Sequence, residues 1–130
     1  MRFRKHYTLK QARKLLPQVR HWLKQLSELQ SALEKGDQRL VALMKPGCDL
    51  GGAVVNKWVR TMAEIKSVLL EFQCREIQVK DLDRGLVDFP ALLSGNEVFL
   101  CWELGEDDIE FWHELDAGYA GRERLEPGTE

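Results

Sequence analysis

The chain has 130 residues, of which 44% are apolar and 31% charged, and its formal net charge is −2. This length suits one globular domain with a core of its own, so we treat residues 1–130 as a single domain. No segment approaches the roughly 20 apolar residues of a membrane helix, and no apolar stretch of a signal peptide follows the basic N-terminus. The three cysteines, Cys48, Cys74 and Cys101, form no CxxC pair, which favours free thiols over a disulfide framework or a zinc knuckle. We therefore expect a soluble, cytoplasmic protein without membrane contact.

Charge is distributed unevenly along the sequence. The first 27 residues contain eight Lys and Arg and no acid, whereas residues 97–130 contain eleven Asp and Glu against Arg122 and Arg124. Opposite charges attract at short range. We therefore expect the basic segment to lie near acidic surface, in the same chain or in a partner.

A first helix is predicted from residue 8. Thr8 and Gln11 have the spacing of a capping box, and apolar residues then recur every three or four positions. The opposite side of this helix is basic and consists of Lys10, Arg13, Lys14, Arg20, His21 and Lys24. Pro17 removes one backbone hydrogen bond and predicts a bend. The pattern continues past Gly36 to residues 45–47, Lys-Pro-Gly, where we expect the helix to end.

A second helix follows a loop at residues 49–52, because apolar residues keep a three-four spacing from Val55 to Phe72. Two such helices joined by a short link form an antiparallel hairpin over residues 8–74. Their apolar stripes are wider than one mutual seam requires, and the additional members are Leu15, Trp22, Leu29, Val59 and Leu70. Large exposed apolar patches usually mark contacts, so we expect a homodimer formed through the helices.

The periodicity changes from helical to alternating after Cys74, which predicts a small antiparallel sheet of three to four strands within residues 75–122. The predicted strands are residues 76–80, 86–93, 98–104 and 109–115. Residues 123–130 are expected to be a frayed tail. The fold class is therefore α+β, a long antiparallel two-helix hairpin followed by a small antiparallel sheet.

Turn lengths predict the register of this sheet. Leu93 is expected to pair with Val98 around a four-residue turn, and Leu104 with Ile109 around the next turn. One face of the sheet then consists of apolar residues, and His113 is the one polar residue on it. We interpret His113 as a structural histidine that hydrogen-bonds Asp116 or a backbone carbonyl, with a role in a site as the alternative.

The same register places Asp88, Glu103 and Glu110 side by side on the opposite face, with His113 excluded from it. Neighbouring carboxylates repel each other, so this row requires a counter-charge or screening by salt. A divalent cation bound by the three carboxylates is one interpretation. A second interpretation is a counter-charge from protein, supplied by Arg84, by Arg122 or by basic surface of another subunit.

The segment after the last predicted strand adds further candidates. His113 and Asp116 are three positions apart, which allows the carboxylate to orient the imidazole ring. The candidate ligand-binding residues are Asp88, Glu103, Glu110, Trp112, His113, Asp116 and Arg122. A nucleophile elbow, an HExxH motif and a phosphate-binding glycine loop are all absent from the sequence. We therefore assign no catalytic residue and no cofactor other than the divalent cation, and we do not expect an enzyme.

Several segments together resemble a known family. They are Tyr7–Pro17, Gln78–Ala91, Val98–Trp102 and Trp112–Arg122. The family is prokaryotic and is catalogued as domain of unknown function 2203, and the resemblance covers most of the chain. It implies a small cytosolic protein with two helices followed by a sheet, and it assigns no activity or functional residue.

Three functions are compatible with these features. The first is an interaction protein that self-associates through its helices. The second is a small protein that binds a divalent metal or another ligand, or a metal-dependent enzyme, and that uses the carboxylates of the sheet together with His113 and Asp116. The third is nucleic-acid binding through the basic face of the first helix, which the pI near 6.0 and the lack of aromatic residues on that face disfavour.

Overall fold

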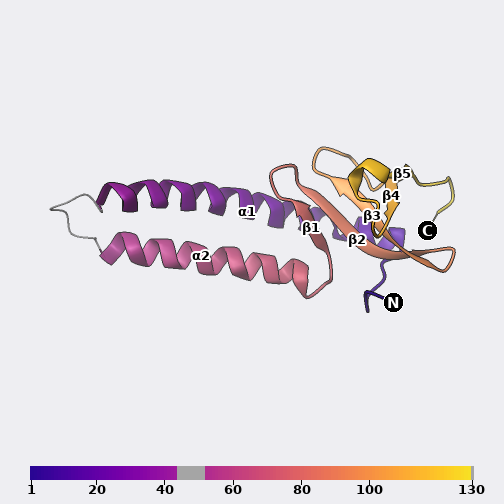
Figure 1. Cartoon of the computed structure of the whole chain (residues 1–130), viewed down its shortest axis with the longest axis horizontal. Coiled ribbons are helices and arrows are strands. Elements are labelled where there is room, and N and C mark those ends of the chain that lie inside the picture. The colour runs from indigo at the N-terminus through magenta and orange to yellow at the C-terminus, as the bar shows by residue number, and fades with distance from the viewer. Residues whose placement is uncertain (44–51, 130) are drawn as a thin grey trace. The chain divides into compact units, whose positions relative to one another are not determined.

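The computed structural model describes residues 1–43 and 52–129, and it confirms the α+β class (Figure 1). Two helices precede one antiparallel sheet. The contacts within the chain form two compact units. The first contains Met1–Leu23 and Phe72–Glu130, and the second contains Lys24–Glu71. Within the described residues, neither helix has the length and apolarity that a membrane span requires.

Helix α1 (Leu9–Leu43) begins at the predicted capping box. The Gln11 amide donates to Thr8 Oγ1 at 3.1 Å, and the Thr8 amide donates to Gln11 Oε1 at 3.0 Å. Pro17 lies inside the helix, and the helix continues through Gly36 as predicted. Helix α2 spans Gly52–Gln73. The predicted helix end at residues 45–47, the start of the loop and Cys48 lie outside the described residues.

The sheet has five strands in sequence order, each antiparallel to its neighbours. They are β1 (Gln78–Asp81), β2 (Leu86–Leu93), β3 (Asn96–Glu103), β4 (Phe111–Glu114) and β5 (Glu123–Arg124). A 3-10 helix, η1 (Tyr119–Gly121), precedes β5. The sequence analysis assigned no strand to β5, because two polar residues carry no alternation of apolar and polar positions.

The predicted register between β2 and β3 is wrong by two residues. Val98 pairs with Ala91 rather than with Leu93, because the turn contains only two residues, Ser94 and Gly95. Both have positive φ angles, 52° and 80°, as a two-residue hairpin turn of type I′ requires. A shift of two residues leaves each side chain on its predicted face.

The predicted register between β3 and β4 is wrong by one residue, and this error reverses the face of every side chain in β4. Leu100 pairs with Trp112, and Phe99 pairs with His113. The physical reason is a longer link, residues 104–110. In this link Ile109 is fully buried outside the strands, although the sequence analysis counted it as a strand residue. His113 therefore faces the same side of the sheet as Asp88.

Both faces of the two central strands are buried. The first turns of α1 cover one face: Tyr7, just before the helix, places its ring 5.5 Å from Phe89, and Arg20 lies over the Trp102 ring. The apolar residues of this layer are Leu9, Ala12, Leu16, Val19, Leu23, Val87, Phe89, Ala91, Val98, Leu100 and Trp102. On the other face Phe3 packs edge-on against Phe99 at 5.3 Å, and the guanidinium of Arg122 lies 3.6 Å from the centre of the Phe111 ring. Polar side chains that point to either face of β2 and β3 are therefore shielded from water.

Gly85 is a position where only glycine fits. Its φ angle is 65°, and a Cβ atom there would lie 2.5 Å from Cβ of Leu104. We expect Gly85→Ala to cost about 3 kcal/mol of unfolding free energy, the sum of left-handed strain and overpacking. Gly95→Ala is the matched control, because Gly95 also has a positive φ angle but open space around it. Gly95→Ala should lose only the unfolding free energy that is due to left-handed strain, about 1–2 kcal/mol. Urea denaturation of both variants measures the difference, and equal losses would contradict this packing.

Candidate functional site

The corrected register brings together three residues on the sheet face away from α1. Asp88 on β2 lies directly opposite Cys101 on β3, and His113 follows on β4. All three are buried, with exposed fractions of 2%, 0% and 2%. One oxygen of Asp88, the Cys101 sulfur and one ring nitrogen of His113 all lie within 4.8 Å of one another. We call this group the Asp–Cys–His cluster.

The His113 ring has two polar partners. Its Nδ1 lies 2.7 Å from the Glu114 carbonyl oxygen, and its Nε2 lies 2.9 Å from Asp88 Oδ2. The predicted backbone carbonyl is thus a partner of His113, whereas Asp116 is not, because Asp116 instead accepts a hydrogen bond from Arg2. The second oxygen of Asp88, Oδ1, is buried without a hydrogen bond of normal geometry among the described residues.

Burial changes the acidity of two members of the cluster. It raises the pKa of the Asp88 carboxyl group, and the neighbouring His113 only partly opposes that shift. Burial, together with the charge of Asp88, raises the pKa of the Cys101 thiol to about 12. Cys101 is therefore protonated at neutral pH and is not a reactive nucleophile.

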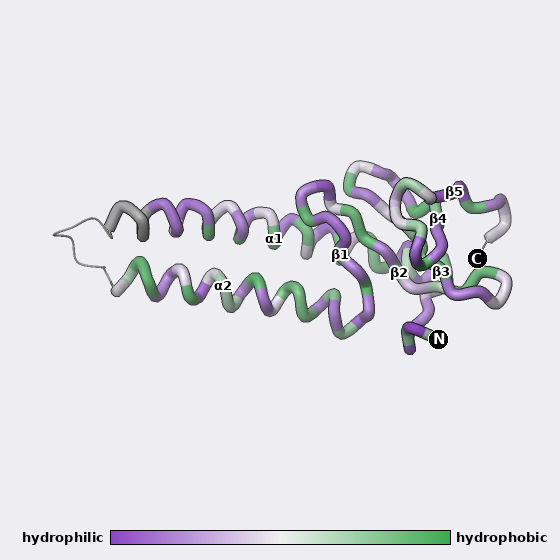
Figure 2. Tube along the Cα trace, in the orientation of Figure 1, coloured by the Kyte–Doolittle hydropathy of each residue, from purple (hydrophilic) through white to green (hydrophobic). Residues whose placement is uncertain are grey.

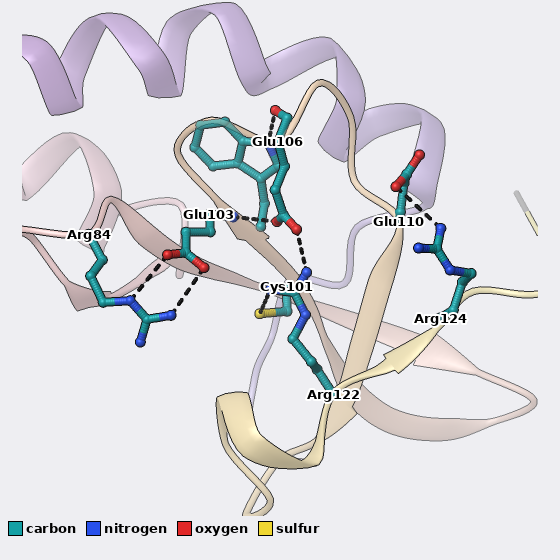
Figure 3. A network of polar contacts seen from close by, with 8 residues as sticks. Arg84, Cys101, Glu103, Glu106, Glu110, Arg122 and Arg124 are labelled. Atoms are coloured by element: carbon teal, nitrogen blue, oxygen red, sulfur yellow. Dashed lines mark hydrogen bonds and ion pairs between the residues drawn. The ribbon is translucent and has the colours of Figure 1, made fainter.

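The predicted row of three carboxylates does not form. Glu103 accepts two hydrogen bonds from the Arg84 guanidinium, both at 3.1 Å, and these are the first cause of its lowered pKa (Figure 3). Glu110 lies outside the strands and pairs with Arg124 at 3.3 Å. Asp88 pairs with His113 instead. The three predicted ligands thus have three different partners, and arginines of the same chain supply two of them.

Arg122, another predicted site residue, lies beside the cluster (Figure 3). Its guanidinium pairs with Glu106, and its Nη1 lies 4.0 Å from the Cys101 sulfur. Glu106 was not among the predicted site residues because it was assigned to a turn. Trp112, another candidate ligand-binding residue, pairs with Leu100 and therefore faces the side of the sheet opposite to Asp88.

The basic face of α1 meets acidic surface of the same chain, as predicted. Arg13 forms an ion pair with Asp108 at 2.9 Å, and Arg20 donates to the backbone carbonyls of Glu106 and Asp107. The other members of the predicted face, Lys10, Lys14 and Lys24, are exposed and form no ion pair among the described residues.

Glu97 anchors the N-terminal segment next to the cluster, a role that the sequence analysis missed. Its carboxylate accepts hydrogen bonds from the backbone amides of Arg2 and Phe3 at 2.8 and 2.9 Å, and it contacts His6 Nε2 at 2.8 Å. These contacts hold Phe3 against Phe99, which is itself next to His113. No local sequence pattern reveals them, since the partners are more than 90 positions apart.

The fold and the cluster describe a small α+β protein with a buried polar site. The model of a family of uncharacterised conserved proteins, DUF2203, matches residues 5–125, and the chain belongs to that family. Comparison with curated proteins and with solved structures found no match. A function must therefore be argued from the geometry of this chain.

The Glu97 contacts predict a dependence of stability on pH. Burial opposes ionisation of Glu97, but the hydrogen bonds from His6 and from the two amides prevail and lower its pKa from 4.5 to about 2. The unfolded chain thus binds more protons than the folded chain between pH 4.5 and 2, and the stability contributed by Glu97 is lost as the pH falls through this range. We expect Glu97→Gln to make the loss of unfolding free energy in this range shallower, as measured by denaturation at a series of pH values.

Glu34→Gln, at an exposed position of α1, controls for the removal of one negative charge. An identical pH profile for Glu97→Gln and the parent protein would contradict the anchoring role of Glu97.

Proposed function

We propose that this chain is a non-enzymatic interaction protein that self-associates through the helical unit, residues 24–71. The observation that carries the proposal is a row of exposed aliphatic side chains on α2. Val59, Met62, Leu69 and Leu70 are 54%, 42%, 42% and 48% exposed. Figure 2 shows hydrophobic residues recurring along this helix. Several large apolar side chains exposed on one helix often mark an interface.

The helical unit also lacks a closed core of its own. Side chains that the heptad pattern directs inward remain only half-buried, and these are Leu29, Leu33, Val54, Trp58, Ile65 and Val68. Two helices form a single layer, and an apolar stripe in one layer is stable only when a second layer covers it. Two hairpins packed together as a four-helix bundle supply that layer.

A second copy of this chain is the partner that the charges favour. Residues 24–71 contain seven Lys and Arg and six Asp and Glu, so two such units meet without strong mutual repulsion. A groove of about 610 Å³ runs between the two helices of the unit. Small residues of α1, including Ser27, Ser31 and Gly36, line one side of it and leave room for aliphatic side chains of another copy.

Nucleic-acid binding has less support. Arg13 and Arg20, two of the six residues of the basic face, are already engaged by the acidic segment of the same chain. A phosphate backbone would have to compete with these contacts.

The proposal predicts that a charge on the α2 stripe prevents association. Leu70→Glu should weaken self-association at least about tenfold, because it would place a carboxylate in a dry interface. The matched control is Leu92→Glu on β2, since Leu92 is similarly exposed, at 44%, but lies outside the helical unit. Light scattering coupled to size-exclusion chromatography at micromolar concentration gives the mass of each species.

We expect a dimer for the parent protein and for Leu92→Glu, and a monomer for Leu70→Glu with an unchanged circular dichroism spectrum. A monomeric parent, or equal dissociation of the two variants, would overturn the proposal.

A further inference from the structure

The Asp–Cys–His cluster contains two facing acceptors that require a shared proton or a metal ion between them. The Glu114 carbonyl oxygen can only accept a hydrogen bond, so the proton of a neutral His113 ring must be on Nδ1. Nε2 then presents a lone pair to Asp88 Oδ2, 2.9 Å away. Two acceptors lie this close only when a positive charge lies between them. That charge is either a proton or a metal ion.

Further donor atoms face the same point. Asp88 Oδ1 is buried without a well-formed hydrogen bond, and the Cys101 sulfur completes a set of ligand atoms within 4.8 Å of one another. Around a tetrahedral zinc ion, donor atoms at about 2.0–2.3 Å from the metal are about 3.3–3.8 Å apart. Side-chain movements of about 1 Å therefore convert the present arrangement into a coordination sphere.

The sulfur, nitrogen and oxygen atoms of the cluster favour one class of metal ion. A thiolate and an imidazole favour Zn²⁺ and related transition metals, whereas Mg²⁺ and Ca²⁺ take oxygen ligands. Zn²⁺ with one thiolate, one carboxylate and one neutral imidazole has no net charge, which suits a buried site. The Glu114 carbonyl orients the histidine in the way that outer-shell partners of zinc ligands do.

We propose that Asp88, Cys101 and His113 form a structural zinc site, with His113 binding through Nε2 and Asp88 through both carboxylate oxygens. The two oxygens, the sulfur and the nitrogen give four-fold coordination of distorted tetrahedral geometry, because the two oxygens of one carboxylate lie closer together than ligand atoms from different residues. The site is structural because all three residues are buried, which leaves no open position for a substrate. This set shares only Asp88 with the row of three carboxylates, and it does not depend on self-association.

The test uses the full-length protein purified without chelator, with bound metal measured by mass spectrometry and site chemistry followed by Co²⁺ substitution. We expect one zinc ion per chain, and a Co²⁺ form with tetrahedral d–d bands and a thiolate-to-cobalt charge-transfer band. Cys101→Ser should abolish the charge-transfer band and weaken metal binding at least about tenfold. Asp88→Asn, which keeps the size and shape of the side chain, should also weaken binding.

The control is the double variant Cys48→Ser/Cys74→Ser, which removes the other two thiols and should retain both the stoichiometry and the charge-transfer band. Circular dichroism verifies that each variant is folded. The proposal is overturned if the parent protein binds neither metal below millimolar concentration. It is equally overturned if Cys101→Ser and Asp88→Asn bind zinc as tightly as the parent does.

Discussion

Strands β2 and β3 are buried on both faces, and much of the sheet unit follows from this constraint. The first turns of α1 cover one face. The other face is covered by short pieces from both ends of the chain, Phe3 and Arg122 among them. A polar group on this second face has no water to bind, so it must find its partners within the protein. The pairing of Asp88 with His113, and the anchoring of the N-terminal segment by Glu97, both meet that requirement.

The charge layout of the chain has a similar structural explanation. The link between β3 and β4 contains a run of acids, and arginines from α1 and from the segment before β5 approach it from two directions. The uneven charge along the sequence is therefore largely compensated inside the sheet unit. Residues 24–71 carry almost balanced charge and expose apolar surface instead. For this reason the proposed association involves the helices rather than the charged segments.

The helices and the existence of the strands could be predicted because both depend on local periodicity. The face of each β2 and β3 residue was also predictable, since a register error of two residues preserves the alternation. The face of each β4 residue could not be predicted, because it depends on whether Ile109 belongs to a strand or to a link. An apolar residue such as Ile109 can be buried in either place. Without that distinction Asp88 and His113 are assigned to opposite faces. Cys101 was predicted to lie on the same face as Asp88, but without His113 on that face the group of three residues could not be recognised.

A purely structural account of the Asp–Cys–His cluster leaves one cost unexplained. Apolar side chains of similar volume in place of a buried ion pair are often neutral or stabilising. A hydrogen-bonded Asp–His pair would satisfy Nε2 and one oxygen, but it would leave Asp88 Oδ1 buried without a well-formed hydrogen bond. A bound metal ion gives that oxygen a partner and uses the sulfur opposite it. The Cys101 thiol also interacts with the Asp88 carboxylate. The two accounts therefore differ in the state of that sulfur, which is a protonated thiol in a hydrogen-bonded cluster and a thiolate in a metal site.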